Sequence, residues 1–388
     1  MKTAERLNHI QEYFFSRKLQ EVDRMRQSGA DIINLGIGSP DLPPPPKVIE
    51  ILCEQAQKKN THSYQSYRGV PDLRNAMAQW YQRWYGVSID AQTEILPLIG
   101  SKEGIVHISM TYLGNGDEAL VPDPGYPTYG TAVELAGANA ITYKLSEEKD
   151  WFPDFEALNK LDLTRVKLMW VNYPNMPTGK AADKNVFEKL VYFGRKHKIL
   201  ICHDNPYSFI LNEKPISILS VEGAKDTAIE LNSLSKTYNM AGWRVGMMAG
   251  AATVINDVLK FKSNMDSGMF LPVQFAAAEA LNTSMEWHRE QNAVYLSRRK
   301  KAEELIHQLG GVFDREQTGM FLWARVPKGF KDGIEFCDYL LQQRNIFITP
   351  GSVFGEAGKH YFRVSLCCPE ERITDSINRI TNNKTQTI

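Results

Sequence analysis

The chain has 388 residues, which is too long for one small core and suits one large domain together with a smaller one. Apolar residues make up 43% and charged residues 23%, as in an ordinary globular enzyme, and 45 basic residues balance 45 acidic ones. This neutral balance argues against nucleic acid or a membrane surface as partner, and no apolar run is long enough to span a bilayer.

The N-terminal stretch MKTAERLNHIQEYFF has early acidic residues and no continuous apolar core, so it does not resemble a signal peptide. We therefore expect a cytoplasmic protein. The five cysteines are odd in number and show no CxxC spacing, which argues against a disulfide framework and against a metal site of the zinc type. We expect them to be reduced core residues.

The first element in chain order is the stretch DLPPPPKVIE at residues 41–50, where a proline run leads from extended chain into a helix and marks a domain hinge. From there to about residue 285, short apolar runs alternate with helical patterns. The predicted strands are EALVPD, ITYKL, KLMWVNY, ILICHD and AIELNS, and DKNVFEKLVYFGRKH is a predicted helix. Strands separated by helices predict a largely parallel sheet that is buried on both faces.

The pattern changes in the last hundred or so residues. The helical run EWHREQNAVYLSRRKKAEELIHQLG precedes three strand-like runs, GMFLWARVP, IFITP and HYFRVSL, with helices between them. This order predicts a smaller α+β domain. We expect a segment 1–44 that joins the small domain, a large domain at 45–285 and the remainder of the small domain at 286–388.

Polar residues follow several predicted strands, and in a parallel sheet ligands bind at the carboxyl ends of the strands. Gly100, Ser101 and Lys102 begin a helix, whose free N–H groups and positive dipole end suit a phosphate, although an ordinary helix cap has the same appearance. Tyr126 follows a turn, where its ring either stacks on a planar ligand or packs in the core. Asp204 ends a buried strand and needs a cation or a protonated nitrogen as partner.

The stretch NSLSKTYNMAGWRVG places Lys236 directly after the last predicted strand of the large domain. A lysine amine becomes a nucleophile toward carbonyls when burial or nearby cations favour its neutral form, whereas most lysines lie in solvent. Ser233, Ser235 and Arg244 are suited to binding a phosphate, and Asp204 to pairing with a pyridinium nitrogen. A phosphorylated pyridine aldehyde, pyridoxal 5′-phosphate, fits all of these residues.

Eight motifs then occur in order along nearly the whole chain: NLGIGSPDLP, SYQSYRGVPDLR, GSKEG, PGYPTY, NYPNMPTG, DNPY, SLSKTYNMAGWRVG and FRVSL. With these motifs the sequence resembles the class I/II aminotransferases, the fold-type-I pyridoxal-phosphate enzymes of the aspartate and diaminopimelate type. The resemblance implies a large three-layer α/β/α domain with a mostly parallel sheet plus a smaller α+β domain. It also implies a ping-pong exchange of an amino group between an amino acid and a 2-oxo acid, through the pyridoxal and pyridoxamine forms of the cofactor.

The resemblance gives three residues catalytic roles. Lys236 would form a Schiff base with the cofactor and move the proton, Asp204 would keep the ring nitrogen protonated, and Tyr207 would hydrogen-bond the ring oxygen O3′. The remaining cofactor contacts would come from Gly100, Ser101, Lys102, Tyr126, Asn175, Ser233, Ser235 and Arg244.

Two further implications concern the substrate and the assembly. Arg363 would clamp the substrate α-carboxylate, helped by the backbone near Gly38. Tyr64 would reach the phosphate from the partner subunit, which implies a homodimer with shared active sites.

One position departs from the family pattern. The family usually has asparagine directly before PTG, where it donates to O3′, and this chain has Met176, whose thioether cannot donate a hydrogen bond. Either Asn175 or Tyr207 then makes this contact alone, or the electronic properties of the cofactor differ here.

Two other functions are compatible with parts of the sequence. A carbon–sulfur β-lyase shares every motif above, because pocket geometry chooses which bond is broken. A cofactor-binding regulatory module fused to a DNA-binding winged helix would need a basic helix-turn-helix extension, and the sequence shows none. The amino donor and acceptor do not follow from these motifs, because loops build the side-chain pocket.

Overall fold

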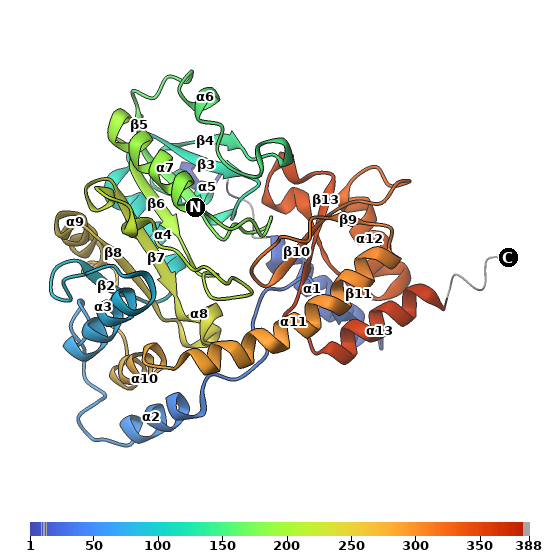
Figure 1. Ribbon diagram of the computed structural model, residues 1–388, viewed down its shortest axis with the longest axis horizontal. Coiled ribbons are helices and arrows are strands. Elements are labelled where there is room, and N and C mark those ends of the chain that lie inside the picture. Colours follow the sequence, from blue (N-terminus) through green and yellow to red (C-terminus); the bar gives the residue numbers. More distant parts are fainter. Residues whose placement is uncertain (9, 11, 13, 383–388) are drawn as a thin grey trace.

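The computed structural model describes residues 1–388 except 9, 11, 13 and 383–388. A seven-stranded sheet with helices on both faces forms the larger part, and a smaller part with a four-stranded antiparallel sheet lies beside it (Figure 1). No helix within the described part of the chain is long and apolar enough to cross a membrane.

The large sheet has the strand order β2-β8-β7-β6-β5-β3-β4, and all neighbours are parallel except the two pairs that β8 makes with β2 and β7. Its strands are β2 (Ile95–Leu98), β3 (Glu118–Asp123), β4 (Asn139–Lys144), β5 (Val166–Asn172), β6 (Leu200–Asp204), β7 (Ala228–Ser233) and β8 (Gly246–Gly250). The five strands predicted from the sequence are confirmed as β3 to β7, and β2 and β8 add two strands that were not predicted.

Strand β5 shows why the inner strands have continuous apolar runs. Leu168 and Trp170 belong to the core on one face of the sheet, and Met169 and Val171 belong to the core on the other face. Successive side chains of a strand point to opposite faces, so a strand that is covered on both sides needs apolar residues at every position. The observed sheet is therefore buried as the sequence predicted.

The helices of the large part cover both faces of this sheet (Figure 1). Helix α7 begins after Asp183, whose carboxylate accepts a hydrogen bond from the Val186 N–H and caps the helix. The helices are α2 (Pro46–Ala56), α3 (Pro71–Tyr85), α4 (Ser101–Tyr112), α5 (Thr128–Leu135), α6 (Phe155–Leu158), α7 (Lys184–His197), α8 (Leu234–Thr237), α9 (Ala252–Lys262) and α10 (Leu271–Leu281).

The smaller part has the sheet order β12-β13-β10-β9. Its elements are α11 (Met285–Gln308), β9 (Val312–Phe313), β10 (Phe321–Arg325), α12 (Gly333–Arg344), β11 (Ile346–Phe347), β12 (Thr349–Pro350), β13 (Tyr361–Ser365) and α13 (Glu370–Thr381). The N-terminal elements α1 (Phe14–Gln27) and β1 (Ile33–Asn34) lie against this part (Figure 1). Strand β1 pairs with β11, and Val22 packs with Leu341 and Phe347.

Candidate active site

A cavity of about 480 Å³ lies where the large sheet meets the smaller part. Its floor is formed by the carboxyl ends of three neighbouring parallel strands, which contribute Asn172 from β5, Asp204 from β6 and Ser233 from β7. Phe321 from β10 and Arg363 from β13 close it from the other side. The cavity therefore lies at the carboxyl edge of the sheet, where the sequence predicted that ligands bind.

One end of the cavity is suited to a phosphate. Ser101 and Lys102 lie in the first turn of α4, and the guanidinium of Arg244 reaches this turn while donating to Ser235 Oγ (3.3 Å). Gly100 has φ +82°, and a Cβ there would lie 2.2 Å from Arg244 Nη2. Only glycine allows the guanidinium this close, so the turn provides a cation and free helix N–H groups together for a dianion.

Asp204 lies buried in the middle of the cavity floor. Its Oδ2 accepts a hydrogen bond from the Tyr129 hydroxyl (2.8 Å), and its Oδ1 has no hydrogen-bond partner among the described residues. Burial raises the pKa of Asp204 to about 6, although the Tyr129 hydrogen bond opposes this rise. A carboxylate with one unsatisfied oxygen fits a protonated ring nitrogen, which would supply both a hydrogen bond and a positive charge.

Lys236 follows β7 directly, on the short helix α8, and its amine reaches the cavity. The Nζ donates to the backbone carbonyl of Gly38. Burial lowers the pKa of Lys236, Cys367 opposes this effect, and the cations Arg363 and Arg244 add to it. The amine is therefore shifted toward its neutral, nucleophilic form, as attack on an aldehyde requires.

Arg363 lies buried at the opposite wall of the cavity. Its Nη2 donates to the Gly36 carbonyl (2.8 Å) and its Nη1 to Met176 Sδ (3.2 Å), and the guanidinium lies 3.9 Å from the centre of the Phe321 ring. A Cβ on Gly38 would lie 2.2 Å from Phe321, so a glycine is needed next to this wall. An arginine held in such apolar surroundings binds a carboxylate strongly, because little water screens the pair.

The structure brings most of the predicted site residues together around this cavity. Those that line it are Gly38, Ser101, Lys102, Tyr126, Asp204, Tyr207, Ser233, Ser235, Lys236, Arg244 and Arg363. Gly100 lies against Arg244, as described above.

Besides Gly100, two predicted residues do not line the cavity. The side chain of Asn175 turns into its own loop, where it donates to the Asn172 carbonyl (3.2 Å) and accepts from the Thr178 hydroxyl (2.8 Å). Tyr64 is 91% exposed, and its contact with a partner subunit stays a prediction.

The sequence analysis missed several residues that shape the site. Tyr129 holds Asp204 and stacks on Trp170, with ring centroids 5.2 Å apart, and Asn172 donates to the Asp204 carbonyl (2.7 Å). Tyr129 comes three residues after Tyr126, in the same PGYPTY motif, and that position was the available signal. The apolar lining residues Phe15, Phe321 and Phe354 gave no signal, because aromatic residues are common in any core.

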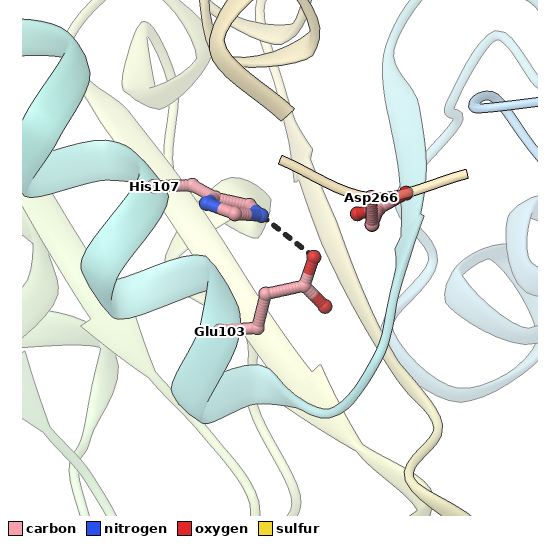
Figure 2. A group of neighbouring side chains, drawn as sticks. All are labelled: Glu103, His107 and Asp266. Carbon is pink, nitrogen blue, oxygen red and sulfur yellow. Dashed lines mark hydrogen bonds and ion pairs between the residues drawn. The ribbon is translucent and has the colours of Figure 1, made fainter. Parts of the chain in front are cut away.

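A second charged cluster lies behind the phosphate end of the cavity. Glu103 and His107 lie on α4 and Asp266 follows α9, and their potential ligand atoms lie within 4.8 Å of one another (Figure 2). Glu103 Oε1 bonds His107 Nε2 (2.6 Å), and the buried Lys262 ammonium pairs with Glu103 (3.4 Å) and with Asp266. Lys262 thus supplies the cation that these carboxylates require.

The cluster braces the turn that begins α4. The second oxygen of Glu103 accepts a hydrogen bond from the Ile99 N–H, directly before Gly100. Burial alone would raise the pKa of Asp266, but hydrogen bonds from Lys262 and from the Gly268 N–H outweigh burial and lower it. Asp266 therefore stays charged, and Glu103 holds the turn in place from behind through its hydrogen bond from the Ile99 N–H.

Comparison with known proteins places this cavity in a family. A family model described as aminotransferase class I and II matches residues 30–380. An LL-diaminopimelate aminotransferase from Dehalococcoides mccartyi is 40% identical over 388 residues, which is 100% of both chains, and one from Moorella thermoacetica is 41% identical over 98% of both. The apo structure of BacF from Bacillus subtilis is 36% identical with a TM-score of 0.94, covering 99% of this chain and 98% of that one. An aspartate aminotransferase structure from Thermus thermophilus shares the fold at 24% identity, with a TM-score of 0.91 over 98% of this chain and 99% of that one.

Proposed function

The chain belongs to the class I and II aminotransferases, and from that premise we propose which residues carry out its reaction and in what order they act. The protein is a pyridoxal-phosphate-dependent aminotransferase, which transfers an amino group between an amino acid and a 2-oxo acid. When bound, pyridoxal phosphate supplies an aldehyde that takes up the amino group and a ring that accepts the electrons released at the substrate α-carbon.

The observation that carries the proposal is the convergence of Lys236, Asp204 and Arg363 on one cavity. Arg363 binds the α-carboxylate and so directs the substrate amino group and α-hydrogen toward Lys236. The amine of Lys236, with its lowered pKa, would accept the proton from the substrate α-carbon. It would then deliver this proton to the aldehyde carbon of the cofactor. Asp204, whose Oδ1 has no hydrogen-bond partner among the described residues, would keep the cofactor ring nitrogen protonated.

The phosphate end of the cavity fixes the position of the cofactor during this exchange. When the cofactor is bound, Ser101, Lys102, Ser235 and Arg244 would hold its phosphate, with the first N–H groups of α4. Tyr126 would cover the ring and Tyr207 would donate to O3′. Burial raises the pKa of Tyr207, so its hydroxyl keeps the proton that it donates.

The two-stage order of the reaction is tested by separating the stages. Holoenzyme mixed with an amino acid and no acceptor should release one 2-oxo acid per active site and no ammonia, since the amino group stays on the enzyme. A 2-oxo acid added afterwards should leave as an amino acid. Continuing release of ammonia and pyruvate without an acceptor would instead indicate the β-lyase reaction.

We also propose the domain division 1–44, 45–285 and 286–388, with the first segment belonging to the smaller domain. The pairing of β1 with β11 and the contacts of Val22 with Leu341 and Phe347 support this division. Helix α2, after the proline run, packs instead on α10 of the large domain. Limited proteolysis that releases intact large-domain fragments cut near these boundaries would support the division.

The enzyme is further proposed to act as a homodimer whose sites share Tyr64. This residue is 91% exposed, and the ring of His62, two residues before it, lies 5.9 Å from that of Phe270, another exposed apolar side chain. Mixing inactive Lys236→Ala with a severely impaired Tyr64→Ala variant should restore activity, because one site of each hybrid is intact. If subunit exchange is verified by mass and activity stays absent, Tyr64 does not act across subunits.

A further inference from the structure

The wall of the cavity around Arg363 is almost entirely apolar. Its side chains come from α1, from the segment after β1, from the loop after β5, from β10 and from the loop after β12. They are Phe15, Leu19, Ile37, Met176, Phe321 and Phe354. Five segments that are far apart in the sequence therefore build one apolar surface next to the residue that binds the α-carboxylate.

Aromatic rings surround the Arg363 guanidinium on several sides. Its central carbon lies 3.9 Å from the Phe321 ring centre, 4.7 Å from that of Phe354 and 5.7 Å from that of Phe15. In an amino acid the α-carbon is one bond from the carboxylate. A substrate side chain therefore starts beside these rings once Arg363 holds the carboxylate.

Apart from Arg363, the residues of this wall that the structure describes as lining the cavity carry no charge. Among the described lining residues the cations are Lys102, Lys236, Arg244 and Arg363, and the acidic residue is Asp204. Under the proposed function Arg363 binds the α-carboxylate and the other four serve the cofactor. A second charge on the substrate would therefore be buried here without a counter-charge.

Helix α1 supplies the part of the wall that lies nearest the chain terminus. Phe15 and Leu19 are four residues apart and so lie on one face of the helix. Ser16 also lines the cavity, and its hydroxyl donates to the Glu12 carboxylate (2.6 Å). The Ser16 hydroxyl is thus already hydrogen-bonded, and Phe15 and Leu19 face the cavity.

We propose that this wall is the side-chain subsite and that it selects amino acids with large apolar side chains, aromatic or branched aliphatic. The inference rests on the proposed function, since it takes Arg363 as the α-carboxylate site. Removing one methylene from a fitted apolar side chain costs about ten-fold or more in specificity. Diaminopimelate, by contrast, carries a second ammonium and a second carboxylate at its far end, for which the wall has no partner.

Binding of carboxylates that lack an amino group tests the subsite without turnover. We would titrate holoenzyme with 3-phenylpropanoate, propanoate and heptanedioate and follow the heat of binding by calorimetry. The expected order is 3-phenylpropanoate tighter than heptanedioate by about ten-fold or more. Equal or tighter binding of heptanedioate would overturn the proposal.

Two variants on α1 test whether this helix contacts the side chain of the ligand. Phe15→Ala and Leu19→Ala should each weaken 3-phenylpropanoate about ten-fold while changing propanoate less than about two-fold, because propanoate does not reach their side chains. Gln20→Ala, at an exposed position of the same helix, is the matched control and should change neither. Equal weakening of both ligands would show that the helix supports the fold and does not contact the side chain.

A panel of amino donors separates failure of this inference from failure of the proposed function. Phenylalanine, leucine, aspartate and diaminopimelate would each be mixed with holoenzyme and an excess of 2-oxo acid, and new amino acid would be measured. Faster transfer from phenylalanine and leucine supports the subsite. Faster transfer from aspartate or diaminopimelate overturns the subsite and leaves the aminotransferase intact, whereas no transfer from any donor contradicts the proposed roles themselves.

Discussion

Two groups of buried charges lie on either side of the first turn of α4, and they are partnered in opposite ways. In the cluster of Glu103, Lys262 and Asp266, carboxylates and an ammonium bond one another directly. In the cavity, Lys236 donates to a backbone carbonyl and Asp204 accepts from a phenol, so each charge meets a neutral group. Each charge of the cluster thus has an opposite charge beside it, whereas Lys236 and Asp204 in the cavity have none beside them among the described residues.

This difference separates structural charges from functional ones. A buried charge with an opposite charge beside it contributes to the fold, and removal of its partner is strongly destabilising. A buried charge that meets only neutral groups costs folding free energy and is retained where a ligand completes it. Substitutions in the cluster should therefore reduce stability, whereas substitutions in the cavity should reduce activity.

The largest effect is expected at Lys236. Lys236→Ala should prevent covalent attachment of the cofactor and lower amino transfer by about 10²–10⁴-fold or more, because the proton-transferring amine is lost. The apoprotein should unfold within about 1 kcal/mol of the wild type, since no ion pair is broken. Borohydride reduction followed by mass analysis measures the attachment, and cofactor trapped on the variant would remove Lys236 from this role.

At Lys262 we expect a large loss of stability. Lys262→Met should lower the unfolding free energy by about 3–5 kcal/mol, because two partly buried carboxylates lose their cation. Lys260→Met, an exposed position on the same helix, should change it by less than about 0.5 kcal/mol. Urea unfolding of both variants gives the comparison, and equal stabilities would mean that the cluster is not structural.

Asp204→Asn should raise the stability of the apoprotein and lower the activity of the holoenzyme. The pKa of this carboxyl is about 6 in the fold against a reference value of 3.8, so the folded state holds the proton more tightly. Ionisation of Asp204 therefore lowers the stability of the fold. This cost is absent well below pH 4, grows between about pH 4 and 6 and is complete above pH 6.

The asparagine variant avoids that cost. The apoprotein should gain up to about 3 kcal/mol at pH 7.5 and clearly less at pH 4.5, as thermal unfolding at the two pH values would measure. Amino transfer by the holoenzyme should fall by about 10²–10³-fold, because an amide cannot balance a protonated ring nitrogen. An apoprotein that loses stability at pH 7.5 would show that Asp204 has a counter-charge in the fold.

The smallest effect is expected at Met176, on the border between the cofactor and the apolar wall. Met176→Asn restores the amide donor that the family usually has at this position and should lower the apparent pKa of the lysine–cofactor linkage by less than about one unit, the value of one hydrogen bond. The pH dependence of the visible absorbance measures it, with Met176→Leu as the apolar control. An unchanged titration would mean that position 176 serves only Arg363, to which Met176 Sδ is bonded (3.2 Å).

The sequence by itself determined the parts of this molecule that depend on local pattern. Apolar runs such as that of β5 predict a sheet covered on both faces, because a strand buried on two sides needs apolar residues at every position. Asp204 and Lys236 were predicted because Asp204 ends one buried strand and Lys236 comes shortly after another, and parallel strands end at one edge. The family motifs added Arg363 and Tyr207, for which periodicity gave no signal.

The tertiary structure alone decided which residues meet across long sequence separations. Neighbouring residues of one loop point differently: Asn175 bonds its own loop while Met176 reaches Arg363, 187 positions away. The ion pair of Glu103 with Lys262 spans 159 positions. Local patterns report whether a side chain is buried, but its partner depends on how separate segments pack, and that depends on contacts along the entire chain.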